Sequence, residues 1–346
     1  MKNNLIISTI LTTGRTGSDY LQGCLDGVPG VITLTGKTCF KDFFEKLELK
    51  KIDLSKQKEV IDEFIKLNSN LFDSDYIEQK IINIDKNIFK INLLNELKNK
   101  SLNKKNFILS IFFAYEKTTR NKTDDVKVIV NHSHSVKETK FFLGLFPECK
   151  LLITIRDPLS NLMSGLKHWK IFKKDIEGQR HNYRYIRRVI SDLRFAEKLF
   201  VNKYFVKLEE SFEITKKKEL CDFLKIEYSE EINFATYNNK FWIGDKLSQN
   251  RTYDGSFNKK VLNRPLKDYF SSRDIFCLRY FYKEYYKKYY HHKKNYFFYD
   301  KIKFYILSIF PLSFEIKEIM KSPTNVSNYI FYFKRVILFF FLKNNS

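Results

Sequence analysis

The sequence predicts an α/β fold in which a P-loop-like parallel sheet is flanked by helices and followed by a helical, basic C-terminal extension. Three observations predict this fold. Short apolar runs, typical of strands covered on both faces, occur at residues 5 to 11, 126 to 130 and 151 to 155. Segments with the apolar spacing of helices separate these runs. From residue 271 onward the pattern is helical and dense in Tyr, Phe and Lys.

The composition indicates a folded protein with an anionic partner. The 346 residues are 43% hydrophobic, which is enough to fill a sizeable core. Residues 251 to 346 hold 19 basic and 7 acidic side chains, and they contribute +12 of the formal charge of +22. The cysteines occur singly, without the spacing of a zinc site or a disulfide scaffold, at Cys24, Cys39, Cys149, Cys221 and Cys277. We therefore expect reduced thiols in a cytoplasmic protein.

The first expected element is a strand over residues 5 to 11. This apolar run is short, and Gly14 and Arg15 stand where a signal peptide would offer a small-residue cleavage site, so a buried strand explains it better. Leu21 and Leu25 lie one turn apart after the glycine-containing turn, which indicates a helix. Residues 40 to 125 have helix-like spacing without recognisable chemistry, and we expect a helical insertion there.

The central part of the chain alternates strands and helices. Residues 136 to 146 can form a helix that crosses back over the sheet between the strands at 126 to 130 and 151 to 155. Pro158 suits the first turn of the next helix. Further expected elements are a helix with a basic face over residues 183 to 200, a strand over 204 to 208 and a helix over 216 to 224. Ligands of such a sheet bind beyond the carboxyl ends of its strands.

The loop after the first strand has the composition of a phosphate-binding loop. It reads Thr13, Gly14, Arg15, Thr16, Gly17 and Ser18. A loop at a helix N-terminus presents backbone N–H groups to an anion, glycines permit close approach, hydroxyls donate hydrogen bonds, and Arg15 adds a fixed cation. The alternative is an ordinary tight turn. The Walker spacing and its lysine are absent, which disfavours hydrolysis of ATP or GTP.

A second anion-binding pattern follows the strand at residues 151 to 155. Arg156 lies at the end of that strand, and Ser164 follows eight residues later, two turns along the next helix. A guanidinium and a hydroxyl in these places can converge on one phosphate.

Together these two motifs resemble those of the sulfotransferase family that uses 3′-phosphoadenosine 5′-phosphosulfate. The first is similar to the 5′-phosphosulfate loop in its Arg-x-Gly-Ser version, which carbohydrate sulfotransferases carry, and the second is similar to the 3′-phosphate motif. Weaker similarity continues at residues 204 to 224 and in the loop around Trp242, so the resemblance covers about residues 5 to 260 without 40 to 125.

The resemblance implies a co-substrate, a reaction and roles for several residues. The donor would be 3′-phosphoadenosine 5′-phosphosulfate, no metal would be needed, and the acceptor would be a hydroxyl of a glycan or glycolipid. Arg15 would act on the bridging oxygen. The implied contacts are Gly14, Thr16, Gly17 and Ser18 on the 5′-phosphate, with Arg156 and Ser164 on the 3′-phosphate.

A histidine is the expected general base, because a neutral imidazole accepts a proton readily at pH 7. His134 follows the strand at residues 126 to 130 and stands 22 residues before Arg156, where cytosolic sulfotransferases carry their catalytic histidine. His132 is an alternative base or sulfuryl-contacting donor, and a carboxylate is a further alternative. His168 is interpreted as structural or substrate-lining.

We expect residues 1 to 270 to form the sulfotransferase-like domain and residues 271 to 346 to pack on it or on a membrane surface. No apolar run reaches the roughly 20 residues that span a bilayer. Residues 304 to 314 and 329 to 342 are aromatic-rich stretches with basic neighbours, which suits an anionic membrane surface. Peripheral association with the inner membrane face is therefore an expectation.

Residues 279 to 299 mix basic and aromatic side chains, which leaves other classes of function open. A single-stranded nucleic-acid binder has such a composition, although no defined nucleic-acid motif is present. A packed helix with solvated lysines explains the same pattern. A kinase-like P-loop enzyme is a further alternative, disfavoured by the missing Walker lysine.

Overall fold

The computed structural model describes residues 5–34, 38–74, 82–120, 125–172, 178–242, 244, 253–291 and 295–341. Contacts group the chain into two compact units. Unit 1 consists of Met1–Thr12, Gly17–Ile155 and Leu199–Lys259. Unit 2 consists of Thr13–Thr16, Arg156–Lys198 and Lys260–Ser346. The division expected from the sequence, at residue 270, stays a prediction.

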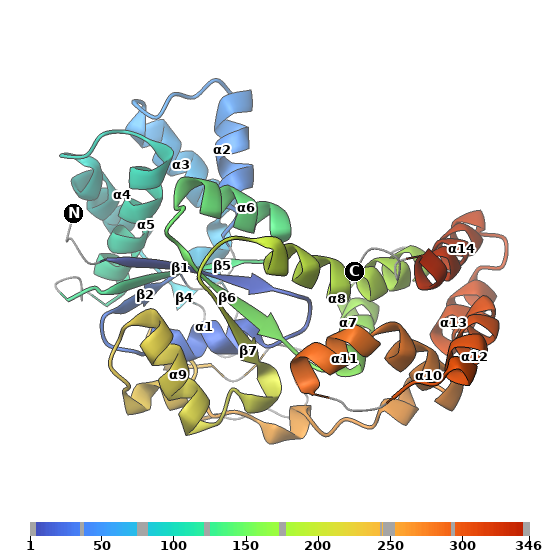
Figure 1. Ribbon diagram of the computed structural model, residues 1–346. Helices are drawn as coiled ribbons and strands as arrows, with labels where there is room; N and C mark the ends of the chain where they lie inside the picture. The colour runs from blue at the N-terminus through green and yellow to red at the C-terminus, as the bar shows by residue number, and fades with distance from the viewer. Residues whose placement is uncertain are drawn as a thin grey trace. The chain divides into compact units, whose positions relative to one another are not determined.

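Unit 1 is built on a five-stranded parallel sheet with the order β2-β5-β1-β6-β7 (Figure 1). The strands are β1 (Ile6–Thr12), β2 (Val31–Thr33), β5 (Val128–Ser133), β6 (Lys150–Ile155) and β7 (Lys203–Lys207). The central strands are buried along nearly their whole length, because both faces of the sheet are covered. Alternate side chains face opposite cores: Ile129 packs in one, and Val128 and Val130 pack in the other.

Helices of unit 1 cover the two faces of this sheet (Figure 1). One face carries α1 (Ser18–Asp26) and α9 (Ile214–Leu224). The other carries α2 (Phe40–Leu49), α3 (Gln57–Leu67), α4 (Lys86–Leu97), α5 (Lys104–Thr119) and α6 (Val136–Leu145). Two short antiparallel pairs complete the unit, β3 (Asp73–Ser74) with β4 (Ile82–Asn83) and β8 (Thr236–Tyr237) with β9 (Lys240–Phe241).

Unit 2 is helical. Its helices are α7 (Pro158–Phe172), α8 (Gly178–Lys198), α10 (Ser272–Phe281), α11 (Lys283–Tyr290), α12 (Phe298–Ile309), α13 (Ser313–Lys321) and α14 (Val326–Phe341). Helix α8 packs against α7, α13 and α14. Its buried residues include Tyr185, Ile186, Val189 and Leu193, whose spacing places them on one face. Short 3₁₀ turns connect several elements of the chain.

The predicted α/β fold, with its parallel sheet and its helical C-terminal region, is confirmed. The strand expected at residues 126 to 130 lies instead at Val128–Ser133, and the short edge strand β2 was not expected. Within the described part of the chain, no helix has both the length and the apolar character to cross a membrane.

Candidate functional site

The loop that leaves β1 adopts backbone conformations that require glycine. Gly14 has a φ of 109° and Gly17 a φ of 79°, both in the left-handed region. A Cβ atom would also collide with a neighbour, lying 2.7 Å from Oδ1 of Asn161 at the first position and 2.3 Å from Cδ1 of Leu208 at the second. Gly17 is the residue before α1, so the loop ends at a helix N-terminus as the sequence predicted.

The side chain of Asn161, on α7, forms hydrogen bonds with the loop backbone at two points. The Arg15 N–H donates to Oδ1 of Asn161 at 2.7 Å, and Nδ2 of Asn161 donates to the Thr13 carbonyl at 2.9 Å. The Asn161 side chain is fully buried. Asp157 fixes the start of α7, because its Oδ1 accepts from the Ser160 N–H at 2.8 Å. Asn161, which the sequence analysis did not single out, therefore binds the loop backbone on both sides of Gly14.

Arg156 lies against the same loop. Its guanidinium donates through Nη1 to the Arg15 carbonyl at 3.3 Å and through Nη2 to the Val261 carbonyl at 2.8 Å. The residue is 4% exposed, and its own carbonyl accepts from the Tyr285 hydroxyl at 3.1 Å. Unit 2 thus brings together Arg15 and Arg156, which are 141 residues apart in the chain.

Tyr185 of α8 fills the space between the loop and α7. A Cβ on Gly165 would lie 2.1 Å from Cζ of Tyr185, and a Cβ on Gly14 would lie 3.2 Å from the Tyr185 hydroxyl oxygen. Burial raises the pKa of Tyr185 to about 12, although Arg15 and Arg156 favour the phenolate. The phenol is therefore protonated at neutral pH, and its ring packs against Gly165 with its hydroxyl next to Gly14.

The remaining predicted donor-site residues lie on the expected elements. Thr16 and Ser18 are buried, at the end of the loop and at the first position of α1. Ser164 is half-buried on α7, in the helix that begins after Arg156. Asp19 also lies in the first turn of α1, where a carboxylate interacts favourably with the helix dipole. The side chains of His168 and Trp169 lie outside the described residues.

His132 is the last residue but one of β5, and both of its ring nitrogens are bound inside unit 1. Its Nδ1 lies 2.8 Å from Oε1 of Gln22, and its Nε2 lies 3.0 Å from the Thr12 hydroxyl oxygen. Gln22 uses its amide nitrogen to donate to the Leu34 carbonyl at 2.5 Å, so its oxygen faces the imidazole. We infer that Nδ1 carries the proton and that Thr12 donates to Nε2. Burial lowers the pKa of His132 to about 3, which keeps the ring neutral.

His134 follows directly after β5 and is half-buried. Its ring centroid lies 4.2 Å from that of His132. A carboxylate oxygen of Asp19 lies 3.8 Å from Nδ1 of His132, and the ligand atoms of the three residues all lie within 4.8 Å of one another. A cation bound there would have to displace the hydrogen bond between His132 and Gln22. Of the two predicted histidines, His134 is half-buried, whereas His132 is 2% exposed.

Four of the eleven aromatic residues of the basic stretch at 279 to 299 are core residues of unit 2, whereas Phe297, Phe298 and Tyr299 are more than 70% exposed. Tyr280, Tyr282, Tyr285 and Tyr289 are all less than 8% exposed. The Tyr282 hydroxyl donates to the Ile186 carbonyl at 2.9 Å. Buried rings cannot stack on bases, so these four residues fit the packed helix with solvated lysines among the alternatives that the composition left open.

No model of a known protein family matches the sequence, and no curated protein matches it. Among solved structures, the chain is similar to the sulfotransferase domain of the Synechococcus PCC 7002 olefin synthase, at 15% identity and a TM-score of 0.41 over 77% of this chain and 86% of that one. The sulfotransferase domain from the curacin biosynthetic pathway has 15% identity and a TM-score of 0.41 over 77% and 94%. Sulfotransferase STF9 from Mycobacterium avium has 11% identity and a TM-score of 0.37 over 66% and 66%. The donor and acceptor of this chain do not follow from these similarities.

Proposed function

We propose that this protein transfers a sulfuryl group from 3′-phosphoadenosine 5′-phosphosulfate to a hydroxyl of a glycan or glycolipid. The observation that carries the proposal is the contact between the two motifs, in which the Arg156 guanidinium donates to the Arg15 carbonyl at 3.3 Å. A nucleotide with phosphates at both its 3′ and 5′ positions needs two cationic groups on neighbouring elements, and Arg15 and Arg156 supply them.

The residues around the loop fit the anionic donor. Glycine at positions 14 and 17 allows the loop its left-handed backbone conformation, and the N-terminus of α1 adds the N–H groups and dipole that favour an anion. The 5′-phosphate would bind Gly14, Thr16, Gly17 and Ser18. Two of the bonds from Arg156 go to neutral carbonyl oxygens, and its guanidinium would bind the 3′-phosphate together with Ser164.

In the proposed reaction the acceptor oxygen forms a bond to sulfur while the bond from sulfur to the leaving phosphate oxygen breaks. Arg15 would stabilise the charge that grows on the leaving oxygen. The acceptor proton would pass to His134, and adenosine 3′,5′-bisphosphate would leave. His132 is unsuited to this role, because Gln22 and Thr12 already occupy both of its nitrogens.

The first test is nucleotide preference, measured by isothermal titration calorimetry with adenosine 3′,5′-bisphosphate and ATP. We expect the bisphosphate to bind far more tightly, and Arg156→Ala to weaken it by roughly 10- to 100-fold, since bonds to charged groups contribute about 1.5–3 kcal/mol. Arg187→Ala, at an exposed position of α8, is the matched control. Tighter binding of ATP than of the bisphosphate would favour a kinase-like enzyme and contradict the proposal.

The second test addresses the base, with radiolabelled sulfate donor and a panel of glycans and glycolipids. His134→Ala should lower turnover on the order of 10²- to 10⁴-fold while bisphosphate binding stays nearly unchanged. His291→Asn, at an exposed histidine, is the control. Turnover that persists within a few fold in His134→Ala would place the base on another residue.

A further inference from the structure

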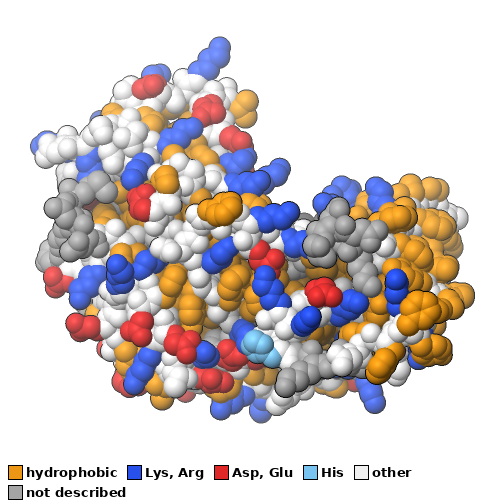
Figure 2. Space-filling model, in the orientation of Figure 1, with side chains coloured by type: hydrophobic (Ala, Val, Ile, Leu, Met, Phe, Trp, Pro, Cys, Tyr) orange, Lys and Arg blue, Asp and Glu red, His pale blue; other side chains and the backbone are white. Residues whose placement is uncertain are grey.

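Helices α12, α13 and α14 of unit 2 present a large exposed apolar surface. Figure 2 shows hydrophobic side chains gathered over these helices. The members are at least 39% exposed, and we call them the C-terminal apolar face: Phe297, Phe298, Ile302, Ile306, Ile309, Phe310, Ile316, Met320, Val326, Ile330, Phe333, Ile337 and Phe341. Soluble monomers rarely expose a contiguous apolar patch of this extent, and such patches mark interaction sites.

Helix α14 shows that this exposure is built into the sequence. Its inward side buries Asn328, Arg335, Leu338 and Phe339. Its outward side carries Val326, Ile330, Phe333, Ile337 and Phe341, whose steps of four and three residues form one stripe. A surface helix of a globular protein normally carries polar residues on that outward side. The described residues of the chain do not cover this stripe, so we infer that another molecule does.

The charged residues near the C-terminal apolar face indicate the chemistry of the molecule that binds it. Every exposed charged side chain between residues 295 and 341, a stretch described in full, is a lysine: Lys301, Lys303, Lys317, Lys321 and Lys334. The acidic residues of the stretch are less exposed than these lysines. Glu315 is fully buried, and Asp300 and Glu318 are half-buried. Apolar side chains bordered by lysines match the interface of an anionic lipid bilayer.

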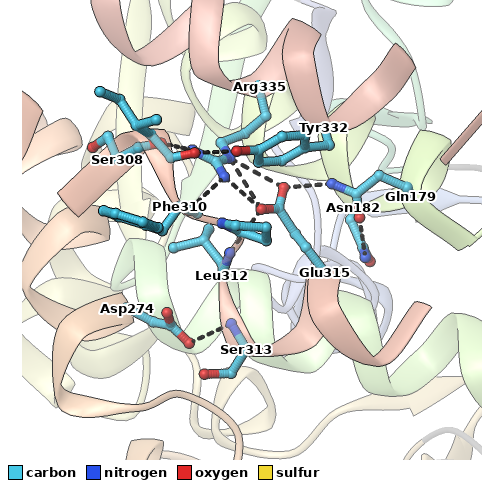
Figure 3. A network of polar contacts seen from close by, with 12 residues as sticks. Gln179, Asn182, Asp274, Ser308, Phe310, Leu312, Ser313, Glu315, Tyr332 and Arg335 are labelled. Carbon is cyan, nitrogen blue, oxygen red and sulfur yellow. Dashed lines mark hydrogen bonds and ion pairs between the residues drawn. The ribbon is translucent and has the colours of Figure 1, made fainter. Parts of the chain in front are cut away.

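A buried ionic network holds the three helices in place beneath the face (Figure 3). The Arg335 guanidinium, at 0% exposure, donates from Nη2 to Oε2 of Glu315 at 2.6 Å and to the Phe310 carbonyl at 3.1 Å, and from Nη1 to the Ser308 carbonyl. Glu315 also accepts from the Leu312 N–H at 2.8 Å and from the Gln179 amide. The network ties α12, α13 and α14 to α8, so the exposed stripe is presented without reorganisation.

We propose that the C-terminal apolar face docks this protein on the surface of an anionic lipid bilayer, with α12 and α14 lying in the plane of the interface. A second copy of the chain is a poorer occupant, because each copy would bring its own five exposed lysines to the same interface. This inference is independent of the transfer reaction proposed above.

The test is co-sedimentation of the full chain with vesicles of phosphatidylcholine alone or mixed with phosphatidylglycerol. The parent should bind the anionic vesicles, and salt should weaken that binding. The double variant Phe333→Asp and Ile337→Asp should lose roughly tenfold in partitioning for each side chain removed from the lipid. Its control is Leu49→Asp with Phe200→Asp, at positions of unit 1 that are 84% and 105% exposed.

A charge series separates electrostatic attraction from apolar insertion. Neutralising Lys317, Lys321 and Lys334 to Gln should weaken binding by about fivefold for each lysine. The same change at Lys58, Lys66 and Lys98, which are exposed lysines of unit 1, is the control and should have little effect.

Three outcomes would overturn the proposal. One is a parent that binds neutral and anionic vesicles equally or binds neither, and another is equal loss in the target and control variants. The third is a parent that ignores vesicles but forms dimers that the aspartate pair Phe333→Asp and Ile337→Asp dissolves, which would make the face a self-association interface. Calorimetric binding of adenosine 3′,5′-bisphosphate to that pair should match the parent, so a failure here leaves the proposed function standing.

Discussion

Replacement of Asn161 by alanine tests whether this side chain determines the path of the glycine loop. The change removes two hydrogen bonds, from the Arg15 N–H at 2.7 Å and to the Thr13 carbonyl at 2.9 Å, at a position with 0% exposure. A buried backbone group left without its partner costs about 1–3 kcal/mol. With two such groups, the free energy that keeps the loop closed should fall by about 2–6 kcal/mol.

The assay is amide hydrogen exchange of the loop, followed by mass spectrometry of peptides that cover residues 12 to 18. A loss of about 2 kcal/mol in local opening free energy accelerates exchange roughly 30-fold, and larger losses accelerate it further. This readout is local, so it does not depend on whether the whole chain unfolds in a single step. The alanine itself suits the helix, which removes helix propensity as a cause.

Asn92→Ala is the matched control for this experiment. Asn92 is a half-buried asparagine of α4 whose amide donates to the Thr118 hydroxyl, which lies on α5, at 3.0 Å. Exchange at residues 12 to 18 should be unchanged in that variant. If Asn161→Ala leaves loop exchange within about threefold of the parent, backbone strain and the glycines hold the loop and the reasoning is wrong.

Two further predictions concern buried polar groups. Arg335→Leu should destabilise the fold by about 3–5 kcal/mol in urea unfolding, because it leaves the buried Glu315 carboxylate without its partner, and adding Glu315→Leu should recover much of the loss. Burial holds His132 neutral in the folded state down to its pKa of about 3, whereas in the unfolded chain it binds a proton below about pH 6.5. The contribution of His132 to the free energy of unfolding is therefore full above pH 6.5 and declines as the pH falls from 6.5 towards 3. His132→Gln should therefore flatten the pH dependence of unfolding by up to about 1.4 kcal/mol per pH unit in that window, and an unchanged slope would contradict the burial argument.

The architecture was predictable because its signals are local. The continuous apolar runs of β1 and β6 mark strands covered on both faces, and the glycine-rich turn before α1 marks a strand followed by a helix. Edge strand β2 escaped prediction, because three residues are too few to show a period. The role of the loop glycines was also predictable, because glycine in a turn between a strand and a helix indicates an unusual backbone conformation. Gly14 and Gly17 both take a positive φ.

The supports of the loop were not predictable, because they depend on contacts between distant segments. Asn161 lies within the second motif, but nothing in a single sequence shows that its amide faces the Thr13 carbonyl, 148 residues earlier. Tyr185 belongs to an amphipathic helix in which several residues share the same face. Only the packing of that helix reveals that its ring excludes any side chain at Gly165. Helix periodicity identifies a buried face but does not show which neighbour that face meets.

The two histidines show how a small shift in a strand boundary changes a chemical interpretation. With a strand ending at Val130, His132 and His134 would both belong to a loop, and local structure would not distinguish them. The strand continues to Ser133, so His132 is paired in register with Ile10 and its ring enters the core. There Gln22 and Thr12 bind both ring nitrogens, and burial keeps the pKa low. His134 lies just past the last paired residue, where a side chain can remain partly exposed, and it is therefore the better candidate on structural grounds.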